Sequence, residues 1–250
     1  MKKSSVQLII ALDVDTFDQA RKLVDELSEV VDIFKVGSQL FTACGPVAVR
    51  YILAKGKKVF LDLKYHDIPN TVANAVSAAV DLGILPHEAV DKKKQPLKSP
   101  GQLFMLTVHA LGGKEMMQRA VEAAAKKAQG IGIKRPLIIG ITVLTSQGNE
   151  DNISRTVLDR ARLAKESGLD GVVASSQEAA LIRREFGKDF VIVTPGIRPQ
   201  GEAKGDQKRV STPAEAIKNG SDYLVVGRPI VAAPSPLEAV KKILREIKGS

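Results

Sequence analysis

Short apolar runs alternate with helix-like stretches eight times along this chain, and this rhythm constrains the fold more than any other feature. The runs are nearly continuous in apolar residues, as expected for parallel strands covered on both faces, and they lie at residues 8–12, 33–36, 58–63, 103–109, 137–144, 171–174, 190–194 and 223–226. The stretches between them repeat apolar residues every three or four positions, at residues 17–30, 46–55, 71–82, 114–129, 152–166, 177–186, 212–219 and 236–247. Thr16, Ser176 and Thr212 occupy positions typical of helix N-caps. Eight such units in 250 residues predict an α/β protein that folds as a single (β/α)8 barrel over residues 1–250.

A doubly wound open sheet is the alternative fold. Such sheets usually have fewer strands and carry a glycine-rich turn after the first strand, whereas this chain has Asp13-Val14-Asp15 there. One segment interrupts the rhythm: residues 85–102 are rich in lysine and proline and lack apolar periodicity. We interpret it as a loop insertion between the third helix and the fourth strand. A solvated loop is favoured over a docking patch for a partner or for nucleic acid.

The charge balance suggests an anionic partner. Thirty-seven basic residues against 28 acidic ones give a net charge of +9, which is common in proteins that bind nucleic acid or phosphate. Aromatic residues make up only 4%, so platforms for stacking bases are not expected. One cysteine, Cys44, excludes an intrachain disulfide, and no apolar run approaches the length of a membrane span. We therefore expect a cytoplasmic protein that binds neither nucleic acid nor membrane.

The end of the third predicted strand carries the clearest chemical signal. Side chains on a strand alternate between two faces, so Phe60, Asp62 and Lys64 share the face opposite to the apolar set. Because a barrel gathers its chemistry at the C-terminal ends of its strands, Asp62 and Lys64 should point into the mouth. Lys35, on the neighbouring strand, and Asp67, three residues further on, are candidates for the same charge array. A salt-bridge network that merely closes the barrel end is the alternative.

The last two strands indicate a phosphate site. Barrels often bind phosphate with the loops after strands seven and eight, which here contain Gly196 with Arg198 and Gly227 with Arg228. Glycine allows close backbone approach, and arginine can supply two parallel hydrogen bonds. Ordinary turns with surface arginines are the alternative. The three histidines are scattered, so no metal site is predicted, and His109, at the end of a buried strand, is expected to be structural.

These residues resemble a known enzyme family, the orotidine 5'-phosphate decarboxylases. The ten residues from Asp62 to Thr71, DLKYHDIPNT, are the most specific match. Further matches follow in order along the chain: Ala11-Leu12-Asp13, Phe34-Lys35-Val36-Gly37, Thr142-Val143-Leu144-Thr145-Ser146, Thr194-Pro195-Gly196-Ile197-Arg198-Pro199, Asp206-Gln207-Lys208-Arg209 and Val226-Gly227-Arg228-Pro229. The resemblance implies a decarboxylase that forms UMP and carbon dioxide without a cofactor.

The resemblance also implies catalytic roles. Lys64 would donate a proton to C6 of the pyrimidine after carbon dioxide leaves. Asp62 would lie beside the departing carboxylate, and Lys35 with Asp67 would complete the array. Asp67, Ile68 and Thr71 would reach the neighbouring subunit's site, which implies a homodimer.

Substrate-binding roles follow from the same resemblance. Asp13 and Lys35 would hold ribose hydroxyls, and Thr145 would lie near the pyrimidine. The phosphate would bind to Gln207, Gly227 and Arg228, and Arg198 and Pro195 would lie in the same region. Gln207 lies on residues 200–210, which would form a mobile lid. The closest rival is a magnesium-dependent sugar-phosphate lyase or epimerase of the same barrel superfamily, which would share the Asp-x-Lys-x-x-Asp pattern.

Overall fold

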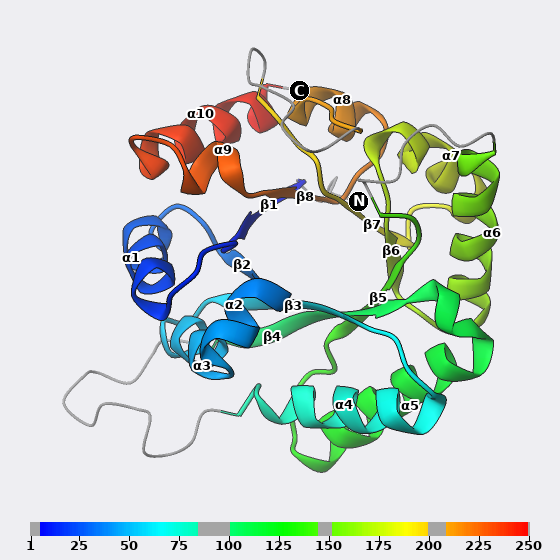
Figure 1. Ribbon diagram of the computed structural model, residues 1–250. Coiled ribbons are helices and arrows are strands. Elements are labelled where there is room, and N and C mark those ends of the chain that lie inside the picture. The colour runs from blue at the N-terminus through cyan, green and yellow to red at the C-terminus, as the bar shows by residue number, and fades with distance from the viewer. Residues whose placement is uncertain (1–5, 85–100, 145–151, 200–208, 250) are drawn as a thin grey trace.

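Eight parallel strands close into a barrel in sequence order (Figure 1). The computed structural model describes residues 6–84, 101–144, 152–199 and 209–249. The strands are β1 Gln7–Ala11, β2 Ile33–Gly37, β3 Lys58–Tyr65, β4 Gln102–His109, β5 Leu137–Ile141, β6 Gly171–Val173, β7 Val191–Thr194 and β8 Tyr223–Val226. Each strand pairs with the next, and β1 pairs with β8, which closes the ring. The predicted (β/α)8 barrel is confirmed.

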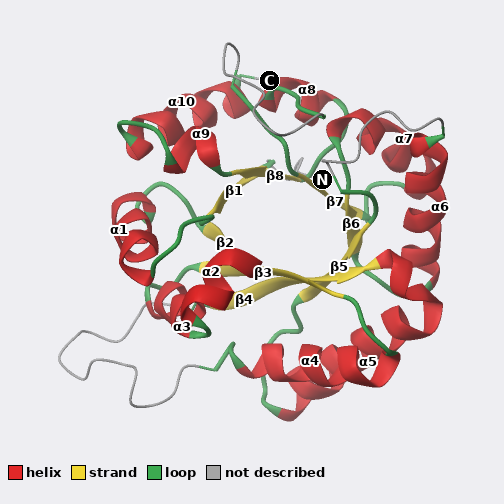
Figure 2. Ribbon diagram, viewed as in Figure 1, coloured by secondary structure: helices red, strands yellow, loops and turns green. Residues whose placement is uncertain are grey.

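Helices surround the strands on the outside (Figure 2). They are α1 Phe17–Leu27, α2 Ser38–Cys44, α3 Val47–Ala54, α4 Pro69–Asp81, α5 Gly113–Gly130, α6 Ile153–Glu166, α7 Ser176–Phe186, α8 Pro213–Lys218, α9 Arg228–Val231 and α10 Pro236–Lys248, with a 3-10 turn at Ala110–Gly112. The short helices α2 and α9 were not predicted. No helix within the described ranges is long and apolar enough to cross a membrane.

Two of the three predicted helix caps are confirmed, and the third shifts by one residue. Thr16 and Thr212 cap α1 and α8, and each forms a reciprocal capping box. The cap of α7 is Ser175 rather than Ser176, because it is the Ser175 hydroxyl that accepts the Gln177 N–H. Residues 85–100 of the predicted insertion lie outside the described residues, and Gln102 already belongs to β4.

The core forms two layers, as strand alternation requires. One apolar cluster fills the barrel interior and comprises Ile9, Ala11, Ile33, Phe60, Met105, Ile139, Val193 and Val225. A larger cluster lies between the strands and the helices, where Val59 and Leu61 of β3 point. The interior cluster closes the barrel below the C-terminal strand ends, so polar side chains above it can gather in one cavity.

Candidate active site

A bulge in β3 shapes the centre of the site. Leu61 pairs with Leu106, but Tyr65 pairs with Val108, so three residues of β3 lie opposite the single residue Thr107 of β4. Lys64, inside this bulge, has a φ of +51°, a left-handed conformation that is uncommon for a residue other than glycine. Such a backbone costs about 1–3 kcal/mol and persists only where its surroundings hold it.

Thr107 holds both ends of this bulge. Its hydroxyl is fully buried, accepts the Lys64 backbone N–H at 2.9 Å and donates to Asp62 Oδ1 at 2.9 Å. Both hydrogen-bonding functions of the side chain are therefore used within the bulge.

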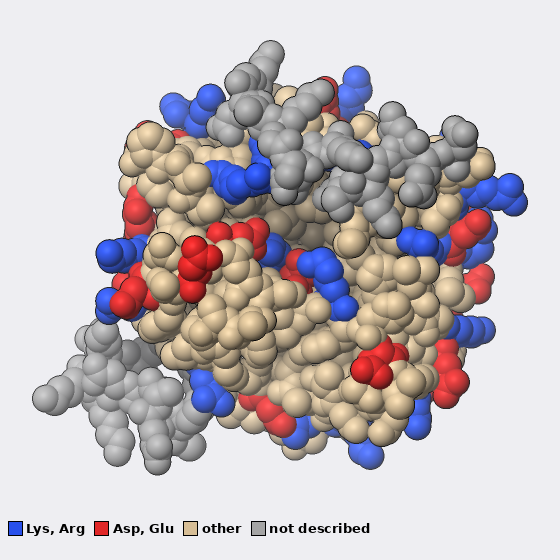
Figure 3. Space-filling view, viewed as in Figure 1, with Lys and Arg blue, Asp and Glu red and all other residues tan. Residues whose placement is uncertain are grey.

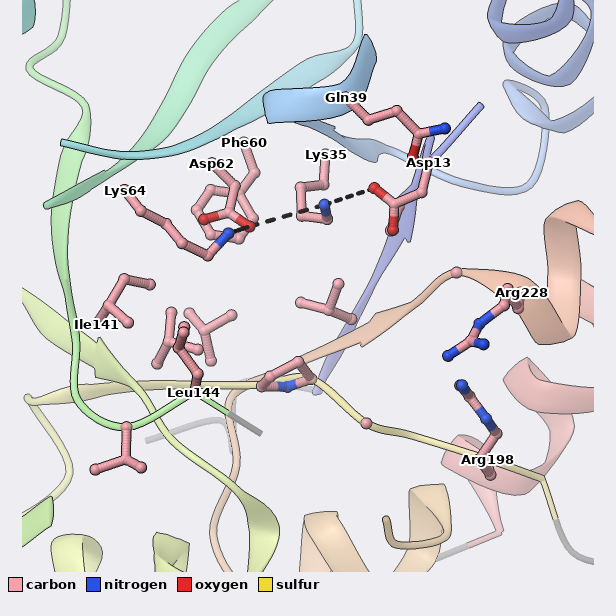
Figure 4. A pocket seen from close by; sticks show the side chains of 18 residues that line it. Asp13, Lys35, Gln39, Phe60, Asp62, Lys64, Ile141, Leu144, Arg198 and Arg228 are labelled. Atoms are coloured by element: carbon pink, nitrogen blue, oxygen red, sulfur yellow. Dashed lines mark hydrogen bonds and ion pairs between the residues drawn. The ribbon is translucent and has the colours of Figure 1, made fainter. Parts of the chain in front are cut away.

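Four charged side chains alternate across the barrel mouth (Figure 4). Lys64 Nζ lies 2.9 Å from Asp62 Oδ2, and Lys35 Nζ lies 3.7 Å from the same oxygen. Lys35 Nζ also donates to Asp13 Oδ1 at 2.9 Å. The side chains of Lys35 and Asp62 are only 10% and 11% exposed, so their mutual attraction is screened weakly by solvent. The order is Asp13, Lys35, Asp62, Lys64.

Glycine at position 37 leaves room for this chain of charges. Gly37 ends β2 and pairs with Asp62. A Cβ atom there would lie 2.8 Å from Lys35 Nζ and 3.4 Å from Asp13 Oδ1. Its backbone is ordinary, with φ at −95°, so space rather than conformation requires the glycine.

Two arginines define the other side of the site. Arg198 follows β7 and is buried, whereas Arg228 follows β8 and is exposed. Figure 4 shows their guanidinium groups pointing toward one another. Two convergent cations at adjacent strand ends form a suitable site for an anion.

Two contacts hold Arg198 and Arg209 in place. The backbone N–H of Arg198 donates to the Ser211 carbonyl at 2.9 Å. The Arg209 guanidinium forms an ion pair with the Glu178 carboxylate of α7, with 2.7 Å between Nη1 and Oε1. Both side chains of that ion pair are almost completely buried. Burial raises the pKa of the Glu178 carboxyl, and the charge of Arg209 opposes this effect. This pair fixes Arg209 against α7.

The four alternating charged side chains and the two arginines line one cavity of about 490 Å³, a size typical of small-ligand sites. Figure 3 shows a hollow at this end of the barrel, with both basic and acidic side chains at its rim. The cavity brings together nine residues predicted from the sequence: Asp13, Lys35, Asp62, Lys64, Pro195, Gly196, Arg198, Gly227 and Arg228.

The other predicted site residues divide into two groups. Asp67, Ile68 and Thr71 do not line this cavity; Asp67 Oδ1 accepts the Ile68 N–H at 2.6 Å. Within one chain, Asp13 rather than Asp67 therefore supplies the fourth charge of the array. Thr145 and Gln207, with most of the predicted lid, lie outside the described residues.

Sequence reasoning missed two residues near the charges. Gln39 lines the cavity and donates to Asp15 Oδ1 at 2.7 Å; its place just after a strand end was the available signal. Thr107 is a polar residue within an apolar strand, which was also a signal, but its partners are 43 and 45 residues away in sequence.

His109 has the structural role expected of it. Its Nδ1 accepts the Leu111 N–H at 3.2 Å and so caps the 3-10 turn. Its ring stacks on His66 at 5.2 Å. Burial lowers the pKa of His109, and the nearby charges of His66, Arg160 and Lys64 lower it further.

The arrangement suits a ligand with two different ends. Facing arginines can bind an anionic group at one end, while a fixed ammonium can stabilise negative charge that develops at the other. The carboxylate of Asp62 lies between the two ammonium groups and keeps them in place.

Comparisons with known proteins agree with one another. Residues 6–243 match the family model described as "Orotidine 5'-phosphate decarboxylase / HUMPS family". The chain is 48% identical to an orotidine 5'-phosphate decarboxylase of Geobacter sp. (strain M21), over 96% of this chain and 95% of the relative. It is 47% identical to that of Moorella thermoacetica, over 97% and 92%. A crystal structure of the decarboxylase from Lactobacillus acidophilus superposes with a TM-score of 0.77 at 34% identity, covering 97% of this chain and 99% of that one.

Proposed function

The chain belongs to the orotidine 5'-phosphate decarboxylase / HUMPS family, and from this premise we propose that it is a carboxy-lyase that converts orotidine 5'-phosphate to UMP and carbon dioxide. The observation that carries the proposal is the alternating row Asp13, Lys35, Asp62, Lys64 in the same cavity as Arg198 and Arg228. It combines an ammonium for the reacting carbon with cations for a remote phosphate.

In the proposed mechanism, the bond between C6 and the carboxylate breaks and its electron pair stays on C6. Carbon dioxide leaves, and the ammonium of Lys64 transfers a proton to C6. The ammonium stabilises the developing charge before it gives up the proton, so it acts both electrostatically and as a general acid. Asp62 Oδ2, 2.9 Å from Lys64 Nζ, keeps that ammonium in position.

We propose that the reaction needs no cofactor. A cofactor would serve as an acceptor for the electron pair on C6. Here a fixed charge of the protein stabilises that electron pair instead. The Lys64 ammonium supports this, because the buried carboxylate of Asp62, itself hydrogen-bonded to Thr107, holds it in place, and a preorganised cation needs no rearrangement during the reaction.

Substrate binding would use the rest of the cavity. Asp13 and Lys35 would hold ribose hydroxyls, while Arg198, Arg228 and the backbone at Gly227 would bind the phosphate. Pro195 would line the same region. Binding energy from this remote phosphate can be used to orient the reacting carbon. Thr145 near the pyrimidine and Gln207 at the phosphate complete the proposed contacts.

We further propose a homodimer with shared sites. Ile68 is 66% exposed, although a large apolar side chain gains from being covered. Asp67, Ile68 and Thr71 lie outside their own chain's cavity, which supports a role in the neighbouring site. The test mixes inactive Lys64→Ala chains with inactive Asp67→Ala chains; hybrid dimers should regain activity, because one of their two sites contains neither change. Confirmed heterodimers without activity would contradict the shared site.

The main test of the function is the loss of orotidine 5'-phosphate absorbance during incubation with the protein and EDTA. Sustained turnover is expected. Loss of this turnover only when EDTA is present would contradict the cofactor-free reaction, and no turnover under either condition would favour the rival class, a magnesium-dependent sugar-phosphate lyase or epimerase. We further propose that the reaction takes place in the cytoplasm, which a chain with a single cysteine, and so with no intrachain disulfide, supports.

A further inference from the structure

Thr107 lies at the point where β3 departs from regular pairing. Three residues of β3 lie opposite it, and the strand regains its register only at Tyr65. A bulge leaves backbone groups without ladder partners. The Lys64 N–H finds its partner in the Thr107 hydroxyl rather than in the backbone of β4.

The same hydroxyl binds the carboxylate that holds the lysine. A threonine hydroxyl has one donor hydrogen and can accept in return. Its hydrogen goes to Asp62 Oδ1, while its oxygen receives the Lys64 N–H. The other oxygen of Asp62 binds Lys64 Nζ. One side chain therefore fixes the lysine at two points, directly at its backbone and indirectly at its ammonium.

We propose that Thr107 is a positioning residue for the reaction, holding Lys64 in its left-handed backbone conformation and setting the orientation of Asp62. The inference rests on the proposed function. Thr107 does not line the cavity, so it acts through Asp62 and Lys64 rather than on the substrate. Its loss should therefore lower kcat and leave binding almost unchanged.

The test compares Thr107→Val, which removes the hydroxyl but keeps the shape, with Thr107→Ser, which keeps the hydroxyl. Thr107→Val should lower kcat about 10- to 100-fold, the usual cost of a lost hydrogen bond to a charged group or of a misplaced reacting group. KM, and the Kd for UMP measured by calorimetry, should stay within about threefold. Thr107→Ser should keep kcat within about threefold.

A matched control is available in β7. Thr194 is also fully buried, and its hydroxyl forms a hydrogen bond of 2.6 Å with the uncharged side chain of Ser221. Thr194→Val should keep kcat within about twofold. If Thr107→Val does not fold, Thr107→Cys replaces it, because a thiol is a weak donor of similar size; its kcat should fall at least about tenfold below that of Thr107→Ser.

Three results would overturn the proposal. The first is a kcat for Thr107→Val, or for Thr107→Cys in its place, close to that of Thr107→Ser. The second is a Thr107→Ser variant as impaired as Thr107→Val, which would assign the effect to packing. The third is a rise in the Kd for UMP that matches the loss of activity. If the unaltered protein itself leaves orotidine 5'-phosphate intact, the proposed function fails as well, and that outcome is distinct from the other three.

Discussion

Replacing Gly37 by alanine should damage catalysis while leaving the fold intact. A Cβ atom at this position would lie 2.8 Å from Lys35 Nζ, whereas nonbonded atoms prefer about 3.5 Å or more. The ammonium must therefore retreat by roughly 0.7 Å, which disturbs its 2.9 Å contact with Asp13. Because a displacement near 1 Å can cost about 100-fold in rate, we expect kcat/KM to fall about 10- to 100-fold, or about 1.4–2.7 kcal/mol.

The stability of this variant should barely change. The Gly37 backbone suits any residue, and the group that must move is the end of a flexible side chain. Steady-state kinetics and thermal unfolding, measured together, test this separation. Gly130→Ala is the matched control, since a Cβ there meets nothing within 4 Å. A kcat/KM for Gly37→Ala within twofold of the unaltered protein would refute the reasoning.

Three further changes probe the phosphate contact and two structural contacts. Arg228→Gln should raise KM about 10- to 100-fold in steady-state kinetics, because it removes a charge-assisted contact to the phosphate; an unchanged KM would exclude that role. Glu178→Ala should lower the thermal midpoint by about 6–20 °C, since it leaves Arg209 buried without its carboxylate; a shift below 2 °C would contradict this. The fold lowers the pKa of His109 below its ordinary value of 6.5 and so favours the neutral imidazole. The stability that neutral His109 contributes is therefore fully present above pH 6.5 and is lost as the pH falls through the folded-state pKa. His109→Asn, which can still accept the Leu111 N–H, should therefore lose less stability between about pH 7.5 and pH 5.5 in thermal unfolding than the unaltered protein does.

The barrel could be predicted because each strand is buried on both faces. Continuous apolar runs separated by helical periodicity leave few other folds for a chain of this length. The helix α2 Ser38–Cys44 was missed because seven residues are too few to display a helical period. β3 runs to Tyr65, two residues further than expected, because its bulge allows pairing to resume.

The charge array could be predicted because a barrel brings its strand ends together. Lys64 shows the limit of that reasoning. Strand alternation alone places it on the face of Asp62, yet its backbone is left-handed and depends on Thr107. The fourth charge is likewise Asp13, two residues beyond the end of β1. Such contacts depend on the bulge in β3 and on the path of the chain beyond the end of β1, which no local pattern specifies.

The most direct test of the central claim measures both products of the reaction, with the unaltered protein and with one variant. Orotidine 5'-phosphate labelled in its carboxylate is incubated with the protein and with Lys64→Ala, both stripped of metal and supplied with no cofactor. We predict equimolar labelled carbon dioxide and UMP from the unaltered protein, and a rate at least about 1,000-fold lower from Lys64→Ala. Absence of labelled carbon dioxide from the unaltered protein, or equal rates from both, would contradict the central claim.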